Sequence, residues 1–321
     1  MSDRPSTSGG SSPEPATDPH PTSPAAPVPV FETTVSDGVC RLVRPETRFL
    51  STGFDGGRRV ADAAYNVTVP EGFDARDLRG YVADRLDRAG FDGEVGPDAA
   101  PALLTGVDQT HARIARSGPV AVLATAGISN PAALPIDGRR DTAGAGGADE
   151  AAGDRRNDAD RQHDADPRHA TDRHHAGTVN LVAGTTRSLS DGALANLLTV
   201  VAEAKAATLL ALTGFPGTTS DAVVVADDPD GEPATFSGSA TPVGRATRVC
   251  VRDAVAASLR SRYGGDSGGS EVSMATGMSG NSDGSNDGIP TDVADADHGV
   301  VTDGRATVTR VETDADPGGD L

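Results

Sequence analysis

The sequence GTVNLVAGTTRSLSDGALANLLTVVAEAKAATLLAL, residues 177–212, places a short apolar run directly before a long helical pattern. Residues 178–183 are mostly apolar, which is typical of a strand covered on both faces. Ser190 is a suitable N-cap for a helix over residues 191–212. A strand followed at once by a helix predicts an α/β fold.

The predicted helix carries two ionisable side chains on opposite sides. Lys205 lies in line with Leu198, Val201 and Leu212 at 100° per residue, so its amine falls in an apolar stripe. Glu203 points the other way among further apolar residues, so we expect a helix buried on both sides. Residues two apart cannot pair with each other. Each group therefore has an ion pair elsewhere or a catalytic use, or Lys205 reaches solvent along its stem.

Apolar runs and helical patterns alternate along the rest of the core. Further strands are predicted at residues 38–44, 60–69, 120–125 and 222–226, and further helices at 74–88, 108–116 and 242–262. Thr241 and Pro242 are typical of a helix start, and Cys250 falls on the apolar face of that helix, where we expect it to pack. The sequence therefore predicts one compact α/β domain with a mostly buried sheet and covering helices.

The composition indicates a core smaller than the chain. The 321 residues include 39 Gly and 22 Pro but only 7 Phe and 3 Tyr, and the net charge is −19. Residues 1–30, 137–176 and 264–321 lack periodic apolar patterns, so we expect a disordered N-terminal tail, a disordered insertion and a disordered acidic C-terminal tail. The core is then residues 31–263, interrupted by residues 137–176.

The charge also limits the partners. A strongly acidic chain without a basic stripe argues against nucleic acid. The absence of an 18-residue apolar run and of a signal peptide argues against a membrane and favours the cytoplasm. Lys205 is the single lysine among many aspartates, which suggests a high-salt cytoplasm where carboxylate repulsion is screened. Cys40 and Cys250 are too few for a disulfide framework.

Metal-binding patterns are weak. Four histidines of the insertion could chelate metal loosely: His163, His169, His174 and His175. Residues 283–288 copy the first half of a calcium loop, but Ala294 stands where the bidentate Glu belongs. No H-E-x-x-H or paired-Cys motif is present, so no metal site or cofactor is predicted, and metal dependence stays open.

Several blocks of this sequence occur in a recognisable order. They contain TAGISN at 125–130, GTVN at 177–180, EAK at 203–205 and SDAVVVA at 220–226. Together with LSTGFDGGRRVADAAYNVTVP at 50–70 they resemble the adenosylcobinamide amidohydrolase family. The resemblance implies corrinoid salvage, in which the amide that joins aminopropanol to the corrin ring is hydrolysed to adenosylcobyric acid and 1-amino-2-propanol. It also implies a small-molecule corrinoid as the partner.

The chain departs from the family pattern at three positions. Asp55 stands where the family has Asn, Ala202 where it has Thr, and Ala240 where it has His. A catalytic histidine at position 240 is therefore excluded. These departures allow a non-catalytic corrinoid-binding module or sensor as an alternative function, and an acidic scaffold that acts through its tails is a third reading.

Amide hydrolysis needs a nucleophile, donors for the developing oxyanion and a proton for the leaving amine. We expect Glu203 to activate water and Lys205, or backbone amides, to stabilise charge. A rival arrangement has Ser129 or Thr125 as nucleophile with Lys205 as base.

The remaining polar residues of the blocks are predicted to bind substrate. Three asparagines are expected at strand ends, where their amides suit the peripheral amides of a corrinoid. The predicted substrate-binding residues are Asp55, Asn66, His111, Ser129, Asn130, Asn180 and Asp221. Two of them also have structural readings, because Asn130 with Pro131 is a common turn start and His111 follows the helix cap Asp108.

Overall fold

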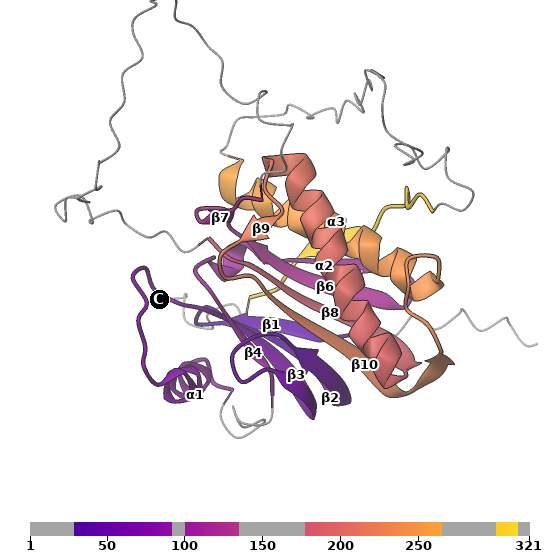
Figure 1. The fold of residues 1–321 in the computed structure, drawn as a ribbon. Helices are drawn as coiled ribbons and strands as arrows, with labels where there is room; N and C mark the ends of the chain where they lie inside the picture. Colours follow the sequence, from indigo (N-terminus) through magenta and orange to yellow (C-terminus); the bar gives the residue numbers. More distant parts are fainter. Residues whose placement is uncertain (1–28, 92–99, 135–176, 265–299, 314–321) are drawn as a thin grey trace, which may run out of the picture.

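A computed structural model describes residues 29–91, 100–134, 177–264 and 300–313 (Figure 1). Most of the three predicted disordered segments, with the insertion histidines and residues 283–294, lies outside the described residues. Within them, nine strands form one mixed sheet in the order β11, β5, β6, β8, β10, β2, β3, β4, with β1 beside β2. Nine strands and the covering helices confirm the predicted α/β domain.

The bounds of the elements follow the chain. The strands of the main sheet are β1 (Glu32–Ser36), β2 (Val39–Ser51), β3 (Gly57–Thr68), β4 (Ala102–Thr105), β5 (Arg113–Ser117), β6 (Val120–Ala126), β8 (Val179–Leu189), β10 (Ala222–Ala234) and β11 (Thr307–Arg310). The short strands β7 (Pro131–Ala132) and β9 (Gly217–Thr218) pair separately. The helices are α1 (Leu78–Arg88), α2 (Asp191–Thr213), α3 (Pro242–Tyr263) and the 3₁₀ turn η1 (Gln109–His111).

The stretch quoted first forms the centre of the fold. β8 is parallel to β10, and α2 is the crossover between them, as a parallel pair requires. Ser190 caps α2 by accepting the Ala193 N–H at 3.2 Å. Both α2 and α3 cover the same face of the sheet, where they pack on the inward side chains of β6, β8 and β10 (Figure 1).

The other face of the sheet encloses a second core. β2 bends at a register shift between Val43 and Thr47, so its first half pairs with β1 while its second half pairs with β10. β1 then reaches the far end of the sheet, where the Val35 N–H donates to the Glu312 carbonyl at 3.0 Å. The sheet therefore curls around a core that includes the fully buried Phe31 and Tyr65.

The helix predicted over residues 108–116 is wrong. The Asp108 side chain does cap a turn, because it accepts the Thr110 N–H at 2.8 Å, but that turn ends at His111 and Ala112 is extended. The following residues form β5, which returns through Gly118 to pair antiparallel with β6. A tight turn before a fully buried strand favours a hairpin over continuation of the helix.

The expectation that α2 is buried on both sides is also wrong. The sheet and α3 cover part of its circumference, and the side that carries Glu203 faces solvent together with Thr199 and the half-exposed Leu210. By length and composition α2 could cross a membrane, with a mean hydropathy of 1.4 over its most apolar window. However, 44% of that window is buried in the fold, as in the core helix of a packed domain.

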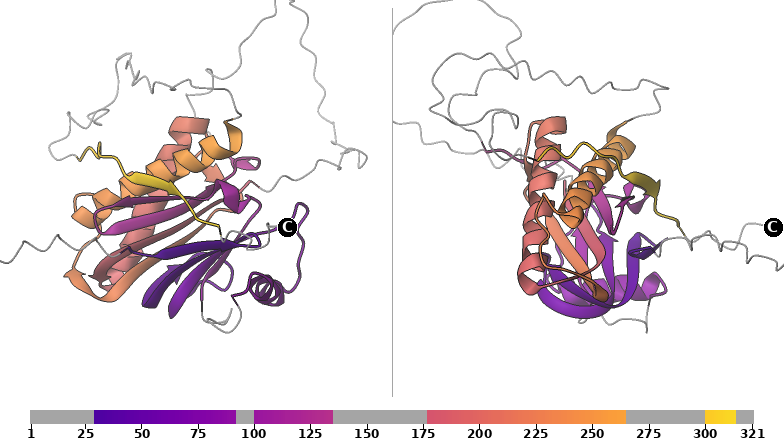
Figure 2. Two further views of the ribbon diagram at one scale, coloured as in Figure 1. Left: turned by 180° about the vertical axis from the view of Figure 1, so that it is seen from behind. Right: turned by 90° about the vertical axis from the view of Figure 1, so that its right-hand side faces the viewer.

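The tail predicted as disordered contains an ordered part. Thr307–Arg310 form β11, which pairs with β5 at the rim of the sheet beside α3 (Figure 2, yellow). Asp253 of α3 anchors this segment by accepting the Ala306 N–H at 2.8 Å. A short strand added to an existing edge gains backbone hydrogen bonds from its neighbour, so it needs little apolar surface of its own.

Candidate active site

The polar residues of the blocks gather at one edge of the sheet. Asn180 pairs with Ala222 across the parallel strands, so β8 and β10 begin side by side. Thr125 pairs with Asn180, so β6 ends beside them. We call this region, with the loops 127–130 and 217–221 and the second half of α2, the amino edge. It includes the amino ends of the parallel strands, whereas sites in open α/β sheets usually lie at their carboxyl ends.

An ion pair between Lys205 and Asp221 is the main charged feature of the amino edge. The two side chains are only 13% and 10% exposed. Asp221 also accepts the Val179 N–H at 2.9 Å, the Thr218 N–H at 3.0 Å and the Thr218 hydroxyl. With so many donors the carboxylate is held in one place, and it fixes the lysine ammonium in turn. The possibility that Lys205 has an ion pair elsewhere is thus realised.

Hydroxyl groups surround this ion pair. Ser220 and Thr178 bond through their hydroxyls at 2.9 Å, and Ser220 is exposed. Neither of these hydroxyls was predicted at the site, although the Gly-Thr-Thr-Ser run before Asp221 was the signal that could have found them. Two further hydroxyl-bearing loops meet here, because β7 pairs with β9.

Ser129 and Asn130 lie on the loop that closes the amino edge. The Thr219 N–H donates to the Asn130 carbonyl at 3.1 Å, and the Ser129 side chain is exposed. Gly177 packs so closely on this loop that a Cβ would lie 2.3 Å from the Ser129 nitrogen. The structure therefore places Ser129 and Asn130 against the start of β8, close to the Ser220 and Asp221 loop.

Asn66 and Asn180 lie inside the molecule. They bond each other at 3.0 Å, Asn66 donates to the Thr125 hydroxyl at 3.0 Å, and Asn180 donates to the Leu104 carbonyl at 2.9 Å. The side chains of this network are at most 1% exposed. In this structure they hold β3 and β4 against β6 and β8, instead of presenting amides to a substrate. The same enclosure argues against Thr125 as a nucleophile.

His111 and Asp55 lie on either side of the amino edge. His111 Nδ1 lies 3.0 Å from the Ser261 hydroxyl, and burial together with the nearby Arg262 charge lowers the pKa of this imidazole. Asp55 occupies a positive-φ turn position, and its hydrogen bond from Arg79 lowers the pKa of the exposed carboxyl. Neither side chain contacts the ion pair of Lys205.

Glu203 is not brought to this site. It is exposed on α2, about 200° around the helix axis from Lys205. Among the described residues, none forms a hydrogen bond or ion pair with its carboxylate. The prediction that it is buried is therefore wrong, and the geometry does not support it as the base for a substrate bound beside Lys205.

Metal-binding and thiol chemistry find little support in the described ranges. No three His, Cys, Asp or Glu side chains described by the structure are grouped so that they could hold a metal ion. Cys40 and Cys250 are fully buried, and burial raises the pKa of each thiol to about 12. The prediction that Cys250 packs in the core is confirmed.

Comparison with known proteins identifies the family. The sequence model of the adenosylcobinamide amidohydrolase family matches residues 28–267. A curated protein of Halobacterium salinarum with the name adenosylcobinamide amidohydrolase is 52% identical over 281 residues, which is 88% of this chain and all of that relative. The matched region includes every element that contributes to the amino edge. The chain therefore belongs to the adenosylcobinamide amidohydrolase family.

Proposed function

We propose that the chain hydrolyses the amide between aminopropanol and the corrin ring of adenosylcobinamide, and that the amino edge carries out the reaction. Family membership supports the reaction. The observation that supports the location is the Lys205 and Asp221 ion pair, because it is a fixed cation beside exposed hydroxyls. Water adds to the amide carbonyl, the carbon–nitrogen bond breaks, and the leaving amine takes a proton.

In this proposal Lys205 stabilises the oxyanion. Its ammonium has three N–H donors, and Asp221 is its one partner among the described residues. The free donors can therefore reach the carbonyl oxygen as negative charge develops there, and one such donor is worth about 10²–10³ in kcat. Asp221 acts as a positioning residue, since the donors that surround its two oxygens leave it poorly suited to take a proton from water.

The hydroxyls of Ser220 and Ser129 supply the second part of the site. Both are exposed at the amino edge, and Ser220 is held by Thr178. Either serine can orient the attacking water or attack the amide directly as a nucleophile. Rapid-quench detection of a corrinoid ester in one serine variant and not in the other would distinguish these roles.

The direct test is incubation of the protein with adenosylcobinamide in high salt, with mass detection of the corrinoid. We expect adenosylcobyric acid and 1-amino-2-propanol in equal amounts. Tight binding of the corrinoid by folded protein without any product would instead identify the binding module or sensor.

The location is tested by comparing Lys205→Met with Glu203→Gln. We expect Lys205→Met to lower kcat about 10²–10³-fold, and Glu203→Gln to keep wild-type turnover because its carboxylate faces solvent. Circular dichroism of both variants checks that they fold. The opposite ranking would return the role of base to Glu203 and move the site away from the amino edge.

We also propose that the protein works in a high-salt cytoplasm. The support is the net charge of −19, the single lysine and a relative from a halophile. Carboxylate repulsion is screened at high ionic strength, where the Debye length is about 3 Å at 1 M. Unfolding on dialysis to low salt is the expected result, and unchanged stability would contradict the proposal.

A further inference from the structure

A separate pocket opens between the C-terminal ends of α2 and α3. Its volume is about 320 Å³. Its wall is mostly apolar and includes Ile128, Leu212, Ala256, Leu259 and Tyr263, with Arg260 at the rim. We call it the end pocket. Two of these side chains are large and partly open to solvent, since Leu212 is 42% and Tyr263 50% exposed.

The end pocket is joined to the amino edge by the backbone. The Ile128 N–H donates to the Tyr263 hydroxyl at 2.9 Å, and Ile128 directly precedes Ser129 and Asn130. On the other wall, Leu212 follows Lys205 by seven residues of the same helix, a rise of about 10 Å. A molecule that is bound with a reacting group at Lys205 therefore has the end pocket within its own length.

The lining of the end pocket suits a planar heteroaromatic ring. Tyr263 offers a half-exposed aromatic ring that its hydrogen bond holds in place, and the Arg262 guanidinium lies 5.5 Å from the centre of that ring. Nucleobases stack on aromatic rings and on guanidinium planes. The volume is at the lower end of the range of about 300–1,000 Å³ for ligand sites, so it matches a nucleoside and is too small for a corrin macrocycle.

We infer that the end pocket receives the adenosine of the corrinoid substrate, and that Tyr263 is the residue on which the adenine stacks. This inference rests on the proposed function for the identity of the substrate. It assigns the two parts of the molecule to two places, with the scissile amide at Lys205 and the adenosine between α2 and α3. Selection of adenosylated corrinoids then depends on the end pocket and not on the amino edge.

The test compares two substrates and one ligand in the wild type, Tyr263→Ala and Tyr263→Phe. Adenosylcobinamide and dicyanocobinamide share the corrin and the scissile amide, but only the first carries adenosine. We expect Tyr263→Ala to lower kcat/KM for adenosylcobinamide about tenfold more than for dicyanocobinamide, and to raise the Kd of 5′-deoxyadenosine in calorimetry about tenfold. Tyr263→Phe keeps the ring and should retain the preference.

The outcomes separate the inference from the proposed function. Equal losses on both corrinoids in Tyr263→Ala, or loss of the preference in Tyr263→Phe, would overturn the inference, because the tyrosine would then act through its hydrogen bond to Ile128. If neither corrinoid is hydrolysed, the proposed function fails, and 5′-deoxyadenosine binding alone decides about the pocket. Phe236→Ala is a matched control, since Phe236 is a 72% exposed aromatic residue remote in sequence from both helix ends.

Discussion

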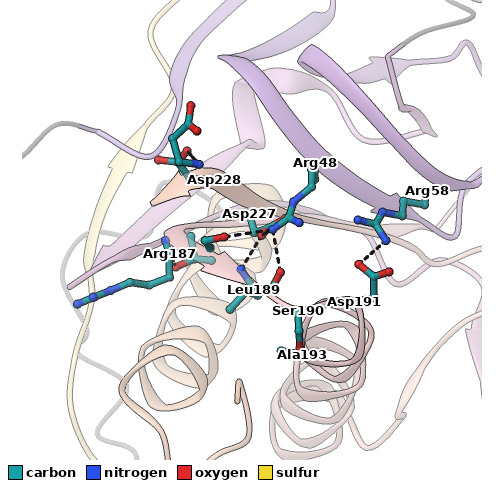
Figure 3. A network of polar contacts seen from close by, with 12 residues as sticks. Arg48, Arg58, Arg187, Leu189, Ser190, Asp191, Ala193, Asp227 and Asp228 are labelled. Carbon is teal, nitrogen blue, oxygen red and sulfur yellow. Dashed lines mark hydrogen bonds and ion pairs between the residues drawn. The ribbon is translucent and has the colours of Figure 1, made fainter. Parts of the chain in front are cut away.

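The two ends of the parallel strands β8 and β10 each carry an ion pair, and the pairs differ in how fully they are used. At the far end, which we call the carboxyl edge, Arg48 pairs with the fully buried Asp227 (Figure 3). Arg48 also donates to the Leu189 carbonyl at 2.8 Å, and the Leu189 N–H donates to Asp227 at 2.7 Å. Arg48 therefore spends its donors on the protein.

Lys205 at the amino edge makes far fewer contacts. Asp221 is its one partner among the residues that the structure describes, although the carboxylate itself is as firmly held as Asp227. The carboxyl edge thus uses its cation to fix the start of α2, while the amino edge fixes a cation and leaves its donors available. An ion pair with unused donors beside exposed hydroxyls is a better indicator of chemistry than a fully bonded one.

The largest effect expected at the carboxyl edge is on stability. Arg48→Met leaves Asp227 buried without its partner, so we expect a loss of about 3–5 kcal/mol in the free energy of unfolding. Arg187→Met is the matched control at the same edge, because its partner Glu232 is mostly exposed and the change should stay below about 1 kcal/mol.

Urea denaturation at constant high salt measures both variants. Lys205→Met should remain closer to the wild type than Arg48→Met in this measurement, since Lys205 and Asp221 are partly open to solvent. A Lys205→Met variant as unstable as Arg48→Met would remove the contrast between the two edges and make both ion pairs structural.

A glycine tests how tightly the amino edge is built. A Cβ at Gly217 would lie 2.7 Å from an Asp221 oxygen and 3.4 Å from the Lys205 amine. Gly217→Ala should therefore displace the ammonium and lower kcat about tenfold, because small misplacements of a catalytic group are costly.

Gly192→Ala at the carboxyl edge is the control for that change. Nothing lies within 4 Å of its Cβ position in the first turn of α2, so activity should be unchanged and stability should rise by about 0.4–1 kcal/mol. Steady-state kinetics on adenosylcobinamide decides. Wild-type turnover in Gly217→Ala would show that the spacing around Lys205 is not critical.

The sequence predicts the centre of the fold better than its rims. Residues 177–212 have a buried strand, an N-cap and a long helix in direct succession, and all three form as predicted. β4, β5 and β11 are short strands that exist because a neighbour offers free backbone groups, and no local pattern encodes that neighbour. The same dependence turned residues 113–117 into a strand instead of a helix.

The site was predicted in its parts but not in its pairing. Lys205 and Asp221 were both singled out, yet their contact depends on how α2 returns the chain from β8 to the start of β10. Asn66 and Asn180 were assigned to substrate because one polar residue in an apolar strand does not reveal whether another element covers it. Glu203 was misassigned because an apolar composition alone does not show which side of a helix faces solvent.

The smallest expected effect is a pH dependence that only the amino edge should show. His111 is the one histidine within the described ranges, and burial with Arg262 lowers its pKa below the ordinary value of 6.5. The unfolded chain therefore takes up this proton first as the pH falls, so the folded state loses stability as the pH drops through about 6.5. His111→Gln removes the titrating group and should lose less stability between pH 8 and pH 5.5.

The difference between His111→Gln and the wild type in urea denaturation isolates this group, because all other histidines are common to both proteins. We expect it to stay within about 0.5 kcal/mol, as for most surface substitutions. A variant that loses more stability than the wild type on acidification would mean that the folded protein favours the imidazolium. The Asp108 carboxylate, which acts in that direction, would then outweigh burial and Arg262, and the amino edge would carry a second cation beside Lys205 at low pH.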